Sequence, residues 1–289
     1  MKNVLIIRRR KLGRTSCREI AAKMGHKAIV HRNDKPYPKV PVDLVIRWGC
    51  TSNVESRNVL NTAEAIHQVN DKVAFRKLCE GHDVCPKTWF DVETFKEEAD
   101  YNADGNLVTD VIGRPRQHAQ GRNLHYCTEL HEVVNIDWKY GEGNYYISEF
   151  IPKVAEYRVF VVGGRVACVA KKTPANPEAI AWNVAQGGRF DNVEWNDWPI
   201  SAVETAVKAF NLTKLDFGGV DVMVDKDKKA YVLEINSAPS LTSEYRQTCM
   251  AKCLGYLAEH GKERIATKKL DKNRYRGFIH PTISEKAEV

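Results

Sequence analysis

The sequence predicts an α/β (α+β) fold, on three observations about the order and pairing of its strands. Apolar strands near the start alternate with a helix, an order typical of a parallel sheet. From residue 144 onward, strands follow one another directly through tight turns, which favours antiparallel pairing. A middle part joins a helix to two strands. We therefore expect four parts, at residues 1–70, 71–140, 141–260 and 261–289.

The N-terminal part is predicted to be a small parallel α/β domain. Its apolar strands are expected at residues 3–7, 26–31 and 43–47. A helix over 16–24 follows the first strand, and Gly25 lies where a helix commonly ends. A second helical stretch is expected over 62–68.

The middle part begins with a helix over residues 71–80, predicted from apolar positions at helical spacing and ended by Gly81. An extended segment at 88–90 follows. Two strands are expected at 107–112 and 124–127. The loop between them, 113–122, contains three Arg, one His and two Gly, a composition suited to phosphate contacts.

The third part is rich in strands. Gly163-Gly164 is a strong hairpin signal between the second and third of them. A loop with several Pro, Asn and Gly residues precedes an amphipathic helix, and a charged turn at 225–229 joins the last two strands. The expected strands are 145–151, 157–162, 165–170, 220–224 and 230–235, the loop is 173–188, and the helices are 201–210 and 242–259. We find no internal repeat.

Composition excludes a largely disordered chain, because 289 residues that are 43% hydrophobic can bury a sizeable core. The formal net charge of +7 is uneven: residues 1–18 have a charge of +7 and residues 261–289 of +4, which leaves −4 for the rest. A basic end can attract phosphate, nucleic acid or an acidic protein, or can be a solvated basic surface.

Eight cysteines are present without a CxxC pair or a matching His pair for zinc, so we expect reduced, buried thiols. The apolar run Val4–Ile7 is too short for the core of a signal peptide. No stretch approaches the length of a membrane span. These features predict a cytoplasmic protein.

The most informative segment is the hairpin of strands 220–224 and 230–235. Asp221 lies on its first strand, and Glu234 and Asn236, two residues apart on the second, face the same side. Such oxygen ligands suit a hard cation shared with substrate phosphates. The alternative is a structural carboxylate pair neutralised by nearby Lys or Arg, since two adjacent carboxylates repel each other.

The segment "DFGGVDVMVDKDKKAYVLEINSAPSL" resembles the magnesium-binding signature of the ATP-grasp superfamily, most closely its RimK-like branch of ribosomal-protein glutamate ligases. The resemblance covers residues 71–242 and the first part only in topology. It implies an ATP-grasp fold, with an N-terminal pre-ATP-grasp domain and two α+β subdomains clamping ATP. It also implies that Asp221, Glu234 and Asn236 bind magnesium, or manganese in its place.

The resemblance also implies an ATP site. "SEFIPKVAEYRVFVVGG" is similar to the adenine segment of the family, with Glu149 at its start and the purine edge held by the backbone of Phe150 and Ile151. Glu156 matches the acidic position near the ribose. Lys72 is expected to reach the phosphates, although a solvated helix lysine is the simpler interpretation. Many ATP-grasp enzymes have Lys-Pro where this chain has Arg114-Pro115, and an arginine there keeps a phosphate-binding charge.

For the reacting groups, the resemblance implies a catalytic Arg158, with a strand salt bridge as the alternative. Lys171 and Lys172 are both candidates for the γ-phosphate and the acyl phosphate, and strand alternation lets only one face the site. "AWNVAQGGRF" resembles the loop near the reacting carboxylate, which indicates Asn183, Gly187 and Gly188. His118 is a candidate proton carrier for the amine.

The implied activity is ATP-dependent ligation: a carboxylate is activated as an acyl phosphate and joined to an amine, with release of ADP and phosphate. The alternatives are an ATP-grasp kinase and a non-catalytic nucleotide-binding regulator. The amine can belong to an amino acid, a peptide or a macromolecule, and the basic ends could dock nucleic acid or an acidic protein. Arg8 and Arg47, at expected strand ends, are candidates for holding a substrate, or are part of a basic surface patch. Segments 113–122 and 173–188 are expected to set specificity. Oligomeric state stays open, a homo-oligomer included.

Overall fold

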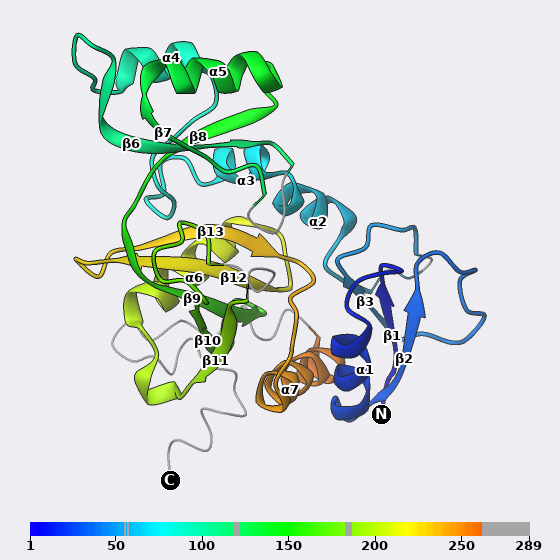
Figure 1. The fold of residues 1–289 in the computed structure, drawn as a ribbon. Helices are drawn as coiled ribbons and strands as arrows, with labels where there is room; N and C mark the ends of the chain where they lie inside the picture. Colours follow the sequence, from blue (N-terminus) through cyan, green and yellow to red (C-terminus); the bar gives the residue numbers. More distant parts are fainter. Residues whose placement is uncertain (55, 57, 118–121, 183–186, 262–289) are drawn as a thin grey trace.

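The computed structural model describes residues 1–54, 56, 58–117, 122–182 and 187–261, and its elements form three sheets with helices packed on them (Figure 1). The predicted tail beyond 261 therefore lies outside the described residues, as do His118 and Asn183. Among the described residues, no helix combines the length and apolar character needed to cross a membrane. All eight cysteines are free thiols, and seven of them are buried.

The first sheet is the predicted parallel one, in the order β2-β1-β3-β4. Its strands are β1 (Asn3–Arg8), β2 (Lys27–Arg32), β3 (Leu44–Trp48) and the short β4 (Val59–Leu60), which the sequence did not reveal. Helix α1 (Arg14–Lys23) follows β1, and Gly25 after it has the left-handed φ of +73° expected at a helix end.

Two short helices lead from this sheet to the rest of the chain. Thr62 caps α2 (Ala63–Asn70) and Asp71 caps α3 (Lys72–Leu78), each by accepting a hydrogen bond from a backbone N–H of the first turn. Asp71 also closes α2, so the two helices meet at one residue. This junction fixes Lys72 at the start of α3.

The second sheet is antiparallel and stands above the third in Figure 1, in the order β5-β8-β6-β7. Its strands are β5 (Thr88–Trp89), β6 (Asn106–Pro115), β7 (His125–Glu129) and β8 (Tyr145–Glu149). Helices α4 (Val92–Glu98) and α5 (Leu130–Tyr140) cover its outer face. Neither helix was predicted from the sequence, because each buries only two side chains and so lacks a clear apolar stripe.

The third sheet is antiparallel, in the order β11-β10-β9-β12-β13. The predicted Gly163-Gly164 hairpin is confirmed, with φ of +58° and +74°. Strand β11 was not foreseen. The elements are β9 (Lys153–Val162), β10 (Arg165–Thr173), β11 (Arg189–Val193), a 3-10 turn η2 (Trp195–Asp197), α6 (Ile200–Leu212), β12 (Phe217–Asp225), β13 (Ala230–Asn236) and α7 (Glu244–His260).

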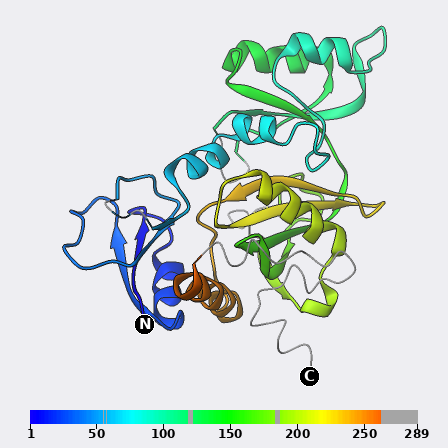
Figure 2. The same cartoon turned by 180° about the vertical axis from the view of Figure 1, so that it is seen from behind.

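The two faces of the third sheet bury different partners. Helix α6 packs on one face, visible from behind in Figure 2, and contributes Val203, Val207 and Phe210 to the largest core. Helix α7 lies against the other face and against α1, so residues of the first and third sheets share one core. The first sheet is thereby held against the third through α7.

Asn61 forms a second connection between the first and third sheets. Its side chain is fully buried, accepts hydrogen bonds from the backbone N–H groups of Asp216 (2.8 Å) and Phe217 (3.1 Å), and donates one to the Phe217 carbonyl (3.0 Å). Its φ of +62° is a left-handed conformation that asparagine tolerates better than most residues. Asn61 thus fixes the start of β12, the strand on which Asp221 lies.

We expect Asn61→Ala to lower the free energy of unfolding by about 3 kcal/mol, because it leaves buried backbone groups unpaired and strains the backbone. Asn61→Gly removes the same hydrogen bonds but relieves the strain, so it should recover about 1 kcal/mol of that loss. Exposed Asn211→Ala on α6 is the control. Chemical denaturation measures all three, and equal stability of Asn61→Ala and the control would contradict this account.

Candidate active site

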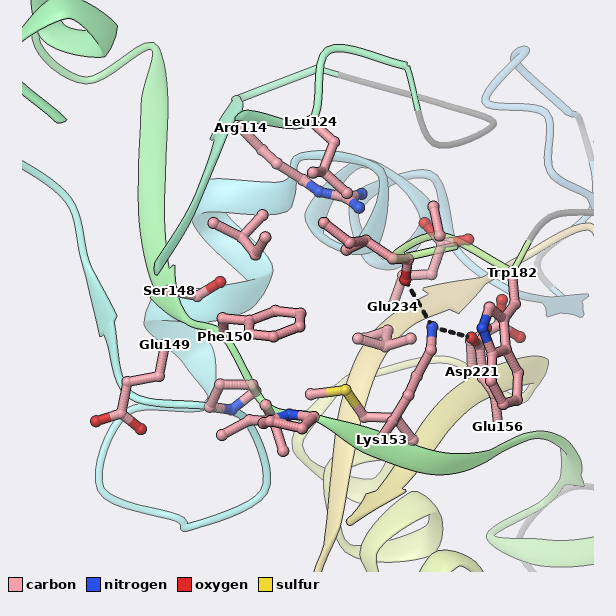
Figure 3. Close-up of a pocket in the computed structure, with 18 of the residues that line it drawn as sticks. Arg114, Leu124, Ser148, Glu149, Phe150, Lys153, Glu156, Trp182, Asp221 and Glu234 are labelled. Carbon is pink, nitrogen blue, oxygen red and sulfur yellow. Dashed lines mark hydrogen bonds and ion pairs between the residues drawn. The ribbon is translucent and has the colours of Figure 1, made fainter. Parts of the chain in front are cut away.

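A nucleotide-sized cavity lies between the second and third sheets. It measures about 320 Å³ and is lined on one side by residues of β6 and β8 and on the other by β9, β10, β12 and β13. Its apolar walls include Ile112, Phe150, Ile151, Met223 and Leu233. Figure 3 shows side chains from these opposed elements directed into one space. Such a slot, with apolar walls and several charged side chains, suits a flat heterocycle with a charged tail.

A larger cavity, of about 1140 Å³, opens next to the first and reaches the N-terminal sheet. Its lining includes Arg9 from the loop after β1, His67 from α2, and Arg189 and Phe190 from β11. Lys172, Asp221 and Glu234 line both cavities. These three side chains therefore stand at the junction of the two spaces.

Strand pairing explains why the acidic residues meet there. Asp221 of β12 lies opposite Glu234 of β13, as the predicted antiparallel hairpin requires. The Asn236 amide donates a hydrogen bond of 3.0 Å to the Glu234 carboxylate, which confirms that these two side chains face the same side. On the other flank of β12, Asp221 lies opposite Arg158 of β9.

Asp221 is paired with two cations. The Arg158 guanidinium donates to both of its carboxylate oxygens, at 2.6 and 2.8 Å, and the Lys172 ammonium lies 3.7 Å away. All three side chains are at least 88% buried. Burial alone lowers the pKa of Lys172 and of Arg158, but Asp221 together with Glu156, and for Arg158 also Glu234, outweighs it, and the pKa of each is raised. Both groups therefore stay charged inside the protein.

Glu156 of β9 extends this cluster toward the smaller cavity. Its carboxylate accepts hydrogen bonds from Lys172 and, at 2.8 Å, from Lys153, and its side chain is only 3% exposed. Lys153 also donates to the Ile180 carbonyl at 3.0 Å and lies 4.8 Å from the ring centre of Trp182. Burial lowers the pKa of Lys153 more than Glu156 raises it.

Glu234 is balanced by Lys72. The two charged groups lie 3.1 Å apart, so the capped start of α3 places a cation at the end of β13. Burial by itself raises the pKa of Glu234, but Lys72, Asn236 and Arg158 hold that pKa well below its usual range. Glu234 is therefore an anion in this environment.

Phe190 covers the cations at the junction. Its ring centre lies 4.6 Å from the Arg158 guanidinium, 5.6 Å from the Lys172 ammonium and 6.0 Å from the Arg246 guanidinium. An aromatic face attracts cations and limits their contact with water. Sequence reasoning missed Phe190, as it missed Lys153 and Trp182. The one available signal for Phe190 was its place beside the Gly187-Gly188 loop.

The predicted residues divide into those brought to the cavities and those that are not. Arg114, Glu149, Phe150, Ile151 and Glu156 line the smaller cavity, Lys72, Arg158, Gly188 and Asn236 line the larger, and Lys172, Asp221 and Glu234 line both. Figure 3 shows the Glu149 carboxylate directed away from the other labelled side chains. Glu156 is engaged by two lysines, so it has little capacity left for a ribose.

Lys171, Arg8 and Arg47 line neither cavity. Lys171 alternates with Lys172 along β10 and is exposed, so the structure brings only Lys172 to the site. Arg8 and Arg47 are buried at the ends of β1 and β3, where their guanidinium groups donate to nearby backbone carbonyls. Arg9, next in the chain, is the residue of that cluster that reaches the larger cavity.

A comparison with family models decides the family. The model of the ATP-grasp domain, R2K clade family 3, matches residues 56–253. The chain is an ATP-grasp protein of this clade. The expected superfamily and fold class are therefore confirmed. The matched residues include strands β4 to β13, and with them the strands that line the two cavities. No curated protein matches the chain in sequence.

Solved structures agree with the ATP-grasp fold over nearly the whole chain. The ATP-grasp ligase PsnB, complexed with minimal precursor, Mg and ADP, has a TM-score of 0.61 at 15% identity, covering 90% of this chain and 97% of PsnB. D-alanine–D-alanine ligase from Bacillus anthracis has a TM-score of 0.63 at 13% identity, covering 92% and 99%. A RimK domain ATP-grasp protein from Sphaerobacter thermophilus has a TM-score of 0.57 at 16% identity, covering 88% and 98%.

We expect Glu156→Gln to lower the free energy of unfolding by about 3 kcal/mol, because the buried Lys172 and Lys153 lose a shared counter-charge. Glu149→Gln, also at the cavity but in no ion pair among the described residues, should change stability by less than about 0.5 kcal/mol. Denaturant unfolding of the two variants beside the parent protein measures the difference. If both variants change the free energy of unfolding by the same small amount, the buried ion pairs of Glu156 contribute nothing to stability.

Proposed function

We propose that this ATP-grasp protein is an ATP-dependent carboxylate–amine ligase, which activates an acid as an acyl phosphate and transfers the acyl group to an amine. The observation that supports this most directly is the junction of the two cavities at Lys172, Asp221 and Glu234. A nucleotide in the smaller cavity would direct its terminal phosphate to this junction. An acid in the larger cavity would meet the phosphate there.

In this proposal the smaller cavity binds ATP. Ile112, Met223 and Leu233 would contact the faces of the adenine, while the backbone beside Phe150 and Ile151 would pair with its edge. Arg114 and Lys153, which line the same cavity, would contact phosphate oxygens. Glu156 would act by positioning Lys153 and Lys172 rather than by binding the ribose, since its oxygens accept from both lysines.

Asp221, Glu234 and Asn236 fit a magnesium ion by the chemistry of their donor atoms. They offer two carboxylates and an amide oxygen from adjacent strands, which are the ligands that magnesium takes together with phosphates. Among the described residues, no group of three or more His, Cys, Asp or Glu side chains is placed to hold a metal ion. When bound, magnesium would neutralise phosphate charge and orient the terminal phosphate for transfer.

The protein's own cations would do the remaining electrostatic work. Arg158, Lys172 and Lys72 now pair with the carboxylates, at the place where phosphoryl oxygens would lie. Arg158 presents a planar fork that can hold two oxygens of an acyl phosphate, and the lysine ammonium groups can follow charge as it moves from the leaving ADP to the transferred group. The attacking amine would then displace phosphate from the acyl carbon.

The substrates would share the larger cavity, whose volume of about 1140 Å³ exceeds what one amino acid fills. Arg9 and Arg189 could pair with a carboxylate of the acid or of the acceptor. The space can take the end of a peptide, and PsnB, which has the same fold, is complexed with a precursor. We propose a small acid as donor and an amino acid, peptide or protein amine as acceptor.

The test is release of ADP and phosphate from magnesium-ATP with pools of amino acids, polyamines and peptides. Glu234→Gln is expected to lower kcat by about 100-fold or more, because it removes an anionic ligand and unbalances Lys72. Exposed Glu97→Gln on α4 is the control and should keep full activity. If a pool gives ADP and a stable phosphorylated product instead of free phosphate, the protein is a kinase and the ligase proposal fails.

ATP binding has a test that needs no turnover. Trp182 lines the smaller cavity, so ATP should change the tryptophan fluorescence of the parent protein. Trp182→Phe should remove most of that change, whereas Trp138→Phe, whose side chain is 88% exposed on α5, should leave it intact. An unchanged ATP response in Trp182→Phe would place the nucleotide elsewhere.

A further inference from the structure

A third cavity lies in the N-terminal sheet, and every described residue that lines it is basic. It measures about 420 Å³, and its lining residues are Arg8, Arg10, Lys11, Arg14, Arg18 and Arg32. All six precede residue 56, where the match to the ATP-grasp family begins. No residue lining this cavity lines the two cavities of the proposed ligase site.

The fold brings these cations together at the carboxyl ends of two parallel strands. Arg8 ends β1 and lies opposite Arg32, which ends β2. Arg14 and Arg18 are one helical turn apart at the start of α1, so they face the same side. The carboxyl ends of the strands in open α/β sheets are a common place for ligands.

The charge of this cavity is poorly balanced by the protein itself. Among the described residues, one acid is paired with the cluster: Asp34 binds Arg32 at 2.6 Å and lies 3.9 Å from Arg10. Six cations this close to one another repel, and a bound anion would relieve that repulsion. Residues 1–18 contain no Asp or Glu that could neutralise these cations.

Arg8 and the start of α1 add unused hydrogen-bond donors. The Arg8 side chain is only 7% exposed, and its Nε has no hydrogen-bond partner in the described structure. Its Nη1 donates to the carbonyls of Arg9 and Arg10, both at 2.9 Å, which fixes the loop that presents Arg10 and Lys11. Helix α1 begins at Arg14, and the N-cap residue before it, Gly13, offers no side chain to cap the first N–H groups. Uncapped N–H groups at a helix start favour an anion.

We propose that this basic cavity is a second anion site, which binds a small molecule bearing two or more adjacent phosphate groups. The guanidinium groups of Arg10, Arg14 and Arg18 offer paired donors that match phosphate oxygens, whereas Arg32 is bound to Asp34 and the Nη1 of Arg8 to backbone carbonyls. The density of charge suits several phosphates better than one carboxylate. No aromatic side chain is among the described residues that line the cavity, so these residues offer no stacking surface of the kind typical of sites for single-stranded nucleic acid. A cavity of this size suits a small ligand.

The site is also next to the proposed ligase cavity. Arg8, Arg10 and Lys11 line the basic cavity, while Arg9 and Leu12 of the same loop line the larger ligase cavity. One five-residue loop therefore separates the two. A phosphorylated ligand held by Arg10 and Lys11 would fix the position of Arg9 beside the reacting groups.

The test is calorimetric titration of the full chain with inorganic tripolyphosphate, without magnesium. The parent protein should bind one equivalent. A triple variant, Arg10→Gln, Arg14→Gln and Arg18→Gln, should weaken binding by a factor on the order of ten or more, since it removes three cations from exposed positions. The matched control removes three exposed lysines of the same sheet region outside the cavity: Lys27→Gln, Lys35→Gln and Lys39→Gln. It should bind like the parent.

Four results with these ligands and variants would overturn the proposal, and so would a fifth with DNA. They are absence of binding by the parent, equal loss in the two triple variants, a loss in Lys72→Gln that matches or exceeds that of the Arg triple, and equal affinity for a hexaglutamate peptide. The third would place the ligand in the ligase site, and the fourth would show general attraction to anions. Binding of a DNA duplex without binding of tripolyphosphate would also overturn it, in favour of a nucleic-acid surface. Circular dichroism of each variant confirms that the fold is retained.

Discussion

The structure depends on a buried cluster of opposite charges at the centre of the third sheet. Asp221, Glu156 and Glu234 would each be costly to bury alone, and each is balanced by Arg158, Lys172, Lys153 or Lys72 at ion-pair distance. These cations come from three strands or helices, so the cluster exists only when β9, β10 and α3 are in place around β12 and β13. Because the cluster already contains charges of both signs, a phosphate can take the place of carboxylates beside the cations, and a metal ion can take the place of cations beside the carboxylates.

The rest of the fold holds this cluster at the junction of two cavities. The second sheet closes the smaller cavity from above. Helix α7 and Asn61 hold the N-terminal sheet against β12, so that residues of this N-terminal part form the far wall of the larger cavity. Phe190 shields the cations from one side. Nucleotide and acid would thus approach the same three side chains from opposite directions. This arrangement would bring a nucleotide phosphate and a carboxylate to the same charged side chains.

Much of the site could be predicted because its signals are local in sequence. Asp221, Glu234 and Asn236 lie on one hairpin, so strand alternation alone places them on one face. The sequence alone could not decide whether Lys171 or Lys172 faces the site. In the structure, where β10 pairs with β9, Lys172 is buried and Lys171 is exposed. Lys153, Trp182 and Phe190 contribute through contacts between distant segments, which no periodicity reveals. Helices α4 and α5 were missed because their buried faces are narrow, and Asn183 and His118 lie outside the described residues.

The central claim is that a carboxylate oxygen is phosphorylated at the junction of the two cavities. The most direct measurement is the fate of that oxygen. Once a reacting acid is found, it is labelled with ¹⁸O in its carboxylate, and the released phosphate is analysed by mass spectrometry. Activation as an acyl phosphate predicts one ¹⁸O atom in the phosphate for each amide formed. Amide formation with unlabelled phosphate would contradict the account.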